Sequence, residues 1–307
     1  MPGFFYLKKF IKNFLDKKLL MIGKSHILNI RNNYNSITTL EDVDYKVFSQ
    51  FGEDGIIDFI LKQLKINNPK FVEIGVGDYS ESNTRFLFEN MGGKGLIIDC
   101  LSDLENKVKK NIKLWQGELS ILEKFVDSSN ILELLKENNF NQNLDFFSLD
   151  IDGVDYWILN EMPSDFSKVV VAEYNSNFGH EAEVTVPNIK NFERNKYHYS
   201  NLCYGMSLKS LINLMKKKNF YFLGSNKKNH NAFFVSKKFT KEKFFPNIII
   251  KDIQNYTDTI IRESRDIKGN LNFLSKKDKL KEIENCEVID VANNLNKKVL
   301  LKDISYD

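Results

Sequence analysis

Cysteine is scarce in this 307-residue sequence, which holds only Cys100, Cys203 and Cys286, far apart and without a CxxC pair. A disulfide framework and a structural zinc site both need more cysteines or closer ones, so the sequence favours neither. A reducing cytoplasm is therefore the expected compartment. Runs of about 20 apolar residues are also absent, which excludes a membrane span.

An excess of charge of one sign is missing too. The chain has 44 Lys and Arg residues against 41 Asp and Glu, a net charge of +3. This balance gives no electrostatic reason to expect nucleic acid as a partner. The length and the hydrophobic fraction of 42% suit one large α/β domain with extensions, or two modest domains.

Short apolar runs alternate with amphipathic segments through the middle of the chain. Strands are predicted at residues 71–74, 95–99, 123–126, 144–149, 169–173, 220–224 and 232–235. Helices are predicted at residues 56–64, 82–90, 101–110, 131–138, 154–160 and 207–218. This alternation predicts a mostly parallel sheet of seven strands with helices on both faces. Only a hairpin fits between the last two strands, so the sheet ends antiparallel.

Two extensions flank this domain, which we place at residues 46–238. In residues 1–45, apolar positions at helical spacing predict a helix, with lysines between them, and residues 29–39 read as a linker. That helix packs on the domain or on a second subunit, or else lies on a membrane surface. Residues 239–307 form an accessory segment, with a helix at 248–264 and a hairpin of 287–292 with 298–301.

A glycine turn follows the first predicted strand directly, in the order Glu73-Ile74-Gly75-Val76-Gly77-Asp78. Glycines at a strand's carboxyl end let the backbone turn sharply and approach a ligand. Glu73 is costly to bury unless a cationic, donor-rich ligand lies nearby, and S-adenosylmethionine is such a ligand. Asp99 ends the next strand, where its carboxylate can accept bonds from ribose hydroxyls.

A dinucleotide is the competing ligand for this turn. Its G-x-G-x-x-G pattern is incomplete, because Ser80 stands at the sixth position. Glu73 would also repel a pyrophosphate. The turn, Glu73, Asp99 and the terminal hairpin together therefore favour the methyl donor.

Five segments of the chain resemble the FkbM-like bacterial methyltransferases, over roughly residues 45–240. They are Ser49-Gln50-Phe51-Gly52-Glu53-Asp54-Gly55, Phe71–Asp78, Glu81-Ser82-Asn83-Thr84, Leu149–Tyr156 and Asn231–Val235. The resemblance implies a Rossmann-like class I methyltransferase fold, S-adenosylmethionine as cofactor, and a link to capsule or other surface-polysaccharide gene clusters. One departure is Tyr79, which stands where the third glycine of E-x-G-x-G-x-G is usual.

The predicted site lies at the carboxyl ends of the strands. The cofactor-binding residues are expected to be Gln50, Glu73, Gly75, Gly77, Asp78, Asn83, Asp99, Asp127 and Asp150. Asp150 and Glu173 are the expected catalytic carboxylates, with His180 as the base. His198 shares the insertion 176–204 with His180, and His230 is a further pocket candidate. Asp150, Asp152 and Glu173 offer hard oxygen ligands to Mg²⁺ or Mn²⁺.

These observations predict an O-methyltransferase acting on a sugar or nucleotide-linked sugar in capsule biosynthesis. Alternatives keep the fold and change the acceptor to a phosphoramidate, an amine or a lipid, or make the chain a non-catalytic partner subunit. A homo-oligomer through the N-terminal helix or the C-terminal segment is a further expectation. The aromatic segment Tyr197–Tyr204 either stacks on a sugar or packs a lid.

Overall fold

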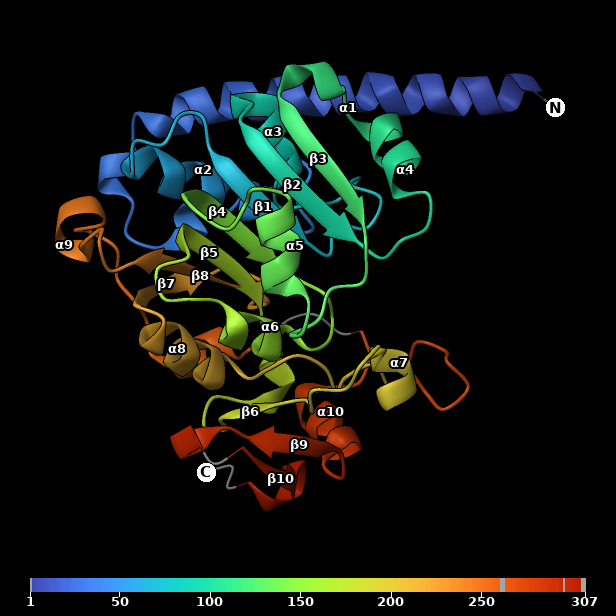
Figure 1. Cartoon of the computed structure of the whole chain (residues 1–307), viewed down its shortest axis with the longest axis vertical. Coiled ribbons are helices and arrows are strands. Elements are labelled where there is room, and N and C mark those ends of the chain that lie inside the picture. Colours follow the sequence, from blue (N-terminus) through green and yellow to red (C-terminus); the bar gives the residue numbers. More distant parts are fainter. Residues whose placement is uncertain (1, 260–262, 295, 305–307) are drawn as a thin grey trace.

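A seven-stranded sheet forms the centre of the chain, in the order β3-β2-β1-β4-β5-β8-β7 (Figure 1). The computed structural model describes residues 2–259, 263–294 and 296–304. The strands of this sheet are β1 (Lys70–Ile74), β2 (Lys94–Asp99), β3 (Glu118–Glu123), β4 (Leu144–Leu149), β5 (Ser167–Glu173), β7 (Phe220–Ser225) and β8 (Asn231–Ser236).

The direction of the strands confirms the predicted arrangement. Neighbouring strands from β3 to β5 pair in parallel, whereas β8 runs antiparallel to both β5 and β7. Five parallel strands and a terminal antiparallel hairpin make this a Rossmann-like fold of the class I methyltransferase type.

Helices cover both faces of the sheet. Successive strand residues point to opposite faces, so Phe71 and Phe146 pack on one side while Val72 and Phe147 pack on the other. Both faces are apolar because both are covered. Helices α2 (Glu53–Gln63), α3 (Arg85–Met91) and α4 (Leu104–Asn111) cover the first face, and α5 (Ile131–Glu137), α6 (Asp155–Glu161) and α8 (Leu208–Lys217) cover the second.

The predicted third strand was placed too late in the chain. β3 occupies Glu118–Glu123, in parallel register with β2, and not residues 123–126. It is an edge strand whose side chains are only partly buried, so its polar residues obscured the strand pattern.

The N-terminal helix is confirmed as α1 (Pro2–Arg31), which runs into the start of the expected linker, and its first turns project past the rest of the molecule (Figure 1). The expected linker after it is wrong. Arg31 and Tyr34 both bind the buried Asp58, and Ile37 is buried. None of the helices in the described ranges is long and apolar enough to cross a membrane.

The C-terminal segment forms a second, three-stranded sheet with the insertion. The predicted hairpin is confirmed as β9 (Glu287–Asp290) and β10 (Lys297–Leu300), and β9 also pairs with β6 (Val184–Thr185). The helix predicted at 248–264 is wrong in the described part, where only Ile253–Tyr256 is helical, as a short 3-10 turn. Three β-branched isoleucines at 248–250 disfavour a helix there, and Ile249 instead donates to the Thr38 carbonyl. The remaining short helices are α7 (Arg194–Tyr197), α9 (Lys241–Phe244) and α10 (Lys276–Ile283).

Candidate functional site

A cavity of about 660 Å³ opens at the carboxyl ends of β1, β2, β4 and β5. Open parallel sheets bind ligands at this edge. The loops after all four strands line it, together with residues 50–51, residues 192–194 and the start of β8. The predicted residues brought to its wall are Gln50, Glu73, Gly75, Gly77, Asp78, Asn83, Asp99, Asp150, Asp152 and Glu173.

The two glycines of the turn after β1 have different structural roles. Gly75 has φ +88°, and a β-carbon built on it would lie 1.6 Å from the Asp150 carbonyl oxygen. Gly75 is therefore required by the packing of two loops. Gly77 has φ +55°, and a β-carbon there would meet no atom within 4 Å. Since Gly77 lines the cavity, its missing side chain leaves space for a ligand.

Tyr79, the departure from the family pattern, adopts the left-handed conformation that a glycine would take, with φ +64°. An aromatic residue is strained there. Its ring is fully buried and its hydroxyl lies 2.9 Å from the Thr84 hydroxyl. Asp78 and Ser80 line the cavity, whereas Tyr79 does not, so its side chain leaves the ligand space open.

Glu73 is satisfied within the protein. Its buried carboxylate accepts bonds from the Ser82 hydroxyl at 2.6 Å, the Asn83 N–H at 2.8 Å and the Thr84 N–H at 2.9 Å, and from the Thr84 hydroxyl. No ligand is therefore needed to explain its burial, although Glu73 also lines the cavity. Glu73 instead anchors the loop that borders the cavity.

Asp99 joins the glycine turn to the next strand. One carboxylate oxygen accepts from the Gly77 N–H at 2.7 Å and the other from the Leu101 N–H at 2.8 Å. Each oxygen keeps a second lone pair. Asp99 can therefore hold the turn and still accept bonds from a ligand's hydroxyl groups.

The segment before α2 is held by two buried carboxylates. One oxygen of Asp54 accepts from the N–H groups of residues 47–49 and from the Ser49 hydroxyl, all at 2.7–2.8 Å. Glu53 accepts from the side-chain amides of Asn226 at 2.6 Å and Asn231 at 2.9 Å. These bonds tie the loop carrying Gln50 to the β7–β8 hairpin.

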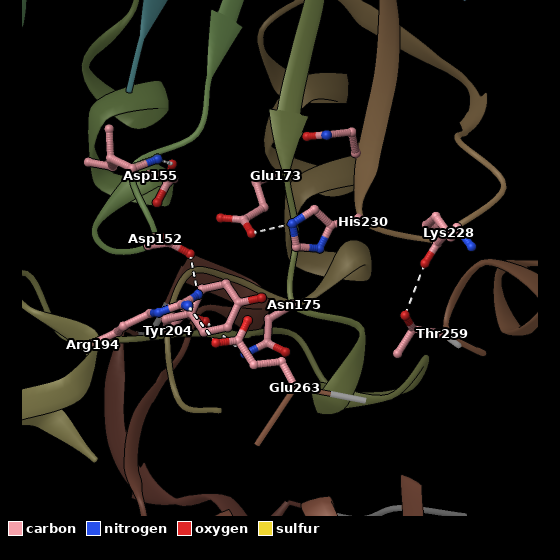
Figure 2. Close-up of polar contacts among 12 residues, drawn as sticks. Asp152, Asp155, Glu173, Asn175, Arg194, Tyr204, Lys228, His230, Thr259 and Glu263 are labelled. Atoms are coloured by element: carbon pink, nitrogen blue, oxygen red, sulfur yellow. Dashed lines mark hydrogen bonds and ion pairs between the residues drawn. The ribbon is translucent and has the colours of Figure 1, made fainter. Parts of the chain in front are cut away.

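Three titratable side chains converge at one end of the cavity, near the ends of β4 and β5. Nε2 of His230 lies 2.8 Å from Oε1 of Glu173 (Figure 2). One ligand atom from each of Asp150, Glu173 and His230 lies within 4.8 Å of the other two. Glu173 is 3% exposed, and its other oxygen, Oε2, has no hydrogen-bond partner in the described structure. Burial, followed by the neighbouring carboxylates, raises the pKa of Asp150 and of Glu173 well above the usual range.

Asp152 does not join this cluster, contrary to its predicted role as a metal ligand. It binds Nη1 of Arg194 at 2.5 Å, and Nη2 of Arg194 lies 3.5 Å from Glu263 (Figure 2). The loop itself is held by Asp155, which accepts from the N–H groups of Ile151 and Gly153. Burial raises the pKa of Asp155 to about 6. The roles of Arg194 and Asp155 were not predicted, although Asp155 belongs to the quoted segment.

The geometry does not support His180 as the base. The chain turns at Gly179, with φ +74°, and His180 lies outside the cavity wall, 3.4 Å from Glu181. His198 is also outside, where it contacts Ser200 and Tyr199. Asp127 lies outside as well, just after lining residues 124–126, and binds Ser129.

The charge of the cavity wall is strongly uneven. Its described part carries nine acidic side chains, from Glu73, Asp78, Glu81, Asp99, Asp150, Asp152, Glu173, Glu193 and Glu263. It carries three basic ones, from Lys124, Arg194 and Lys279. Asp150 and Glu173, whose pKa is raised, hold their protons more tightly than ordinary carboxyls, but without them seven acidic side chains still face three basic ones. The wall therefore attracts cations and disfavours phosphates.

No protein-family model matches the chain, and no curated protein matches it significantly. Solved structures resemble it at low identity. An S-adenosylmethionine-dependent methyltransferase from Clostridium acetobutylicum shares 11% identity, covering 64% of this chain and 93% of its own, with a TM-score of 0.40. A putative RNA methyltransferase from Pyrococcus horikoshii shares 10%, covering 72% and 96%, with a TM-score of 0.36.

A putative sarcosine dimethylglycine methyltransferase from Galdieria sulphuraria is similar at 12% identity, covering 60% of this chain and 71% of its own, with a TM-score of 0.34. Identities and scores this low establish nothing about a ligand or a reaction. The chemistry therefore rests on the residues of the cavity.

Proposed function

We propose that the chain is an S-adenosylmethionine-dependent methyltransferase that acts on a sugar hydroxyl in surface-polysaccharide synthesis. The observation that carries the proposal is a cavity at the carboxyl edge of this sheet, with nine acidic and three basic side chains in its described wall. A cationic sulfonium ligand suits that wall, whereas the pyrophosphate of a dinucleotide does not. The sugar and the capsule role are supported by the FkbM-like segments of the sequence.

The residues present fit the cofactor. The cavity has the volume of a typical small-molecule site, and Gly77 leaves its floor open. Asp99 keeps lone pairs for ribose hydroxyls while holding the turn. When bound, S-adenosylmethionine supplies an electrophilic methyl group that an acceptor oxygen attacks in line.

The reaction also needs a group that takes up the proton of the sugar hydroxyl. A sugar hydroxyl is a weak nucleophile at neutral pH, so its proton must be taken up as the methyl group is transferred. Asp150, Glu173 and His230 lie together at one end of the cavity, and we assign the uptake of this proton to them. Arg194 and Tyr204 line the same end of the cavity and orient the acceptor, with the guanidinium 5.2 Å from the centre of the ring.

An amine acceptor is the second candidate, since the acidic wall also attracts a cationic substrate. The same wall disfavours a phosphoramidate. Comparing hydroxyl and amine acceptors of equal size in a methyl-transfer assay separates the two.

The cofactor is tested by calorimetry with S-adenosylmethionine and with NAD. We expect the first to bind and the second not to bind. Asp99→Ala should weaken binding at least about tenfold, through the lost hydroxyl contacts and the released turn. Glu105→Ala, an exposed carboxylate on α4, is the matched control and should bind like the wild type. Absence of S-adenosylmethionine binding refutes the proposal.

We also propose that Asp150, Glu173 and His230 hold a divalent cation, Mg²⁺ or Mn²⁺, at the acceptor end. The ligand atoms lie within 4.8 Å of one another, and the buried Oε2 of Glu173 lacks a partner that a cation would supply. Carboxylate oxygens suit these metals, and Mn²⁺ also accepts imidazole. A cation held there lowers the pKa of a bound hydroxyl.

Mn²⁺ titration followed by electron paramagnetic resonance tests the cation directly. Glu173→Gln should weaken binding about tenfold or more, because a neutral amide is a poorer ligand. Glu263→Gln changes a carboxylate of the same cavity outside the cluster and should leave binding unchanged. If Mn²⁺ does not bind while S-adenosylmethionine does, the cation is discarded and proton transfer falls to the Glu173–His230 pair.

A further inference from the structure

One stripe of side chains on helix α1 faces the domain. Asp16, Leu20, Gly23 and Ile27 recur at spacings of three and four, on one side of the helix. Ile27 is 1% exposed and packs with Val47, Phe48 and Phe86. A β-carbon on Gly23 would lie 2.7 Å from Val47, so the helix approaches the domain closely. This inner stripe accounts for the attachment of α1.

A second apolar stripe lies on the opposite side of the same helix. Leu7, Ile11, Phe14, Leu15 and Ile22 also recur at helical spacing, and they are between 47% and 61% exposed. Isolated exposed apolar side chains are ordinary, but several gathered on one side of a helix mark an interaction surface. We call these five residues the outer stripe.

The charge of this helix differs from that of the rest of the chain. Residues 1–31 contain seven basic side chains and one acidic side chain, a net charge of +6, so the remaining residues carry −3 of the chain's total of +3. The one acidic residue, Asp16, binds Arg85 on the inner side. Helical geometry places Lys17 beside the outer stripe and Lys18 within it, where Nζ of Lys18 lies 5.4 Å from the centre of the Phe14 ring. Lys12, on the other side of the stripe, binds the Asn111 side chain of the domain at 2.6 Å.

We propose that the outer stripe of α1 docks on an anionic phospholipid surface. Apolar side chains flanked by lysines bury themselves at the boundary of headgroups and acyl chains, while the lysines meet negative headgroups. A second copy of the chain suits the stripe less well, because pairing two such helices brings lysines together without an acidic partner. The proposal does not depend on the proposed reaction.

Vesicle flotation of the full chain tests this docking. We expect binding to phosphatidylcholine vesicles that contain roughly one-third phosphatidylglycerol, weaker binding to pure phosphatidylcholine, and loss of binding at high salt. Ile11→Glu/Leu15→Glu should reduce binding about tenfold or more. Leu132→Glu, a side chain of α5 that is 46% exposed, is the matched control and should bind like the wild type.

A second variant keeps the apolar stripe and changes only the charge. Lys17→Gln/Lys18→Gln should weaken binding to the mixed vesicles and reduce its salt dependence. Circular dichroism checks that each variant keeps its helix content. No binding by the wild type, or equal binding by wild type and Ile11→Glu/Leu15→Glu, overturns the proposal. So does a dimer in sedimentation velocity that this variant dissociates while vesicles remain unbound.

Discussion

The Glu173 carboxylate and the His230 imidazole meet at 2.8 Å because of the way β8 pairs with β5. The two strands run antiparallel, and Glu173 at the end of β5 lies opposite Asn231 at the start of β8. His230, the residue before Asn231, therefore reaches the edge where the loops that line the cavity gather. The terminal hairpin thus completes one end of the cavity as well as the sheet.

His230→Ala is expected to weaken Mn²⁺ binding about tenfold or more, since it removes one of three converging ligands. His180→Ala is the matched control, because that imidazole lies outside the cavity wall. Mn²⁺ titration of the two variants and the wild type measures this. Equal affinities for His230→Ala and the wild type would contradict the placement of the metal.

Glu173→Gln is expected to raise the thermal midpoint at pH 8 in the presence of a chelator. Burial, followed by the charges of Asp152 and Asp155, raises the pKa of Glu173 above its usual range. The folded state then binds more protons than the unfolded state, so this carboxyl lowers stability as pH rises above about 4.3 and through its folded pKa. Glutamine does not ionise, so the variant does not lose this stability as pH rises.

The difference between Glu173→Gln and the wild type should therefore narrow as pH falls towards about 4, measured by thermal unfolding across pH. Added Mn²⁺ should stabilise the wild type more than the variant. A difference that stays constant from pH 8 to pH 4 would show that the pKa of this carboxyl is not raised in the folded chain.

The sheet was predictable because its strands are covered on both faces and read as short apolar runs. The seven-residue gap before the last strand allowed only a hairpin. β3 was misplaced because an edge strand lacks that coverage. The N-terminal helix was predictable from its apolar spacing, although two opposite apolar stripes left its partner open.

The strand-end residues of the site were predictable for a topological reason. Carboxyl ends of parallel strands share one edge, so Gly77, Asp99, Asp150 and Glu173 meet there. His180 was predicted as the base because it is near Glu173 in the sequence. The turn at Gly179 directs the chain away, so His180 lies outside the cavity wall. His230 was a pocket candidate because it directly precedes the last strand. The antiparallel pairing of β8 with β5 is what brings it to this edge.

The two glycines of the turn should respond differently to alanine. Gly75→Ala is expected to destabilise the chain by about 3 kcal/mol or more, because its β-carbon overlaps the Asp150 carbonyl. Gly77→Ala should cost only about 1–2 kcal/mol, from its left-handed conformation. It should nevertheless weaken S-adenosylmethionine binding at least about tenfold, because its methyl group enters the ligand space.

Urea unfolding and calorimetry measure the two effects separately. Normal S-adenosylmethionine affinity in Gly77→Ala would place the cofactor elsewhere in the cavity. A Gly75→Ala variant as stable as Gly77→Ala would contradict the close approach of the two loops.

Tyr79 supports the turn from the side away from the ligand. Tyr79→Phe is expected to cost about 1 kcal/mol, through the lost bond to Thr84, and to leave S-adenosylmethionine affinity unchanged. Tyr79→Gly relieves a strain of about 1–2 kcal/mol but leaves a cavity worth about 3–5 kcal/mol, so it should destabilise the chain. Urea unfolding checks both values. A more stable Tyr79→Gly variant would show that strain outweighs packing here.

Arg85 fastens α1 to the domain through a buried set of bonds. Its side chain is 2% exposed, binds Asp16 at 2.7 Å and Glu89 at 3.0 Å, and lies 3.7 Å from the centre of the Phe48 ring. It also donates to the Ser80 carbonyl at 3.0 Å, beside the cofactor loop. One guanidinium therefore joins the N-terminal helix to the wall of the cavity.

Arg85→Met is expected to destabilise the chain by about 3–5 kcal/mol, because it leaves two carboxylates partly buried without their cation. Arg85→Lys keeps the charge but loses the planar fork, so its cost should be intermediate. Asp16→Asn isolates the α1 contact, and limited proteolysis should then cut within α1 while the sheet stays intact. Urea unfolding ranks the three variants. An Asp16→Asn chain that resists cleavage as well as the wild type would show that the apolar inner stripe alone holds the helix.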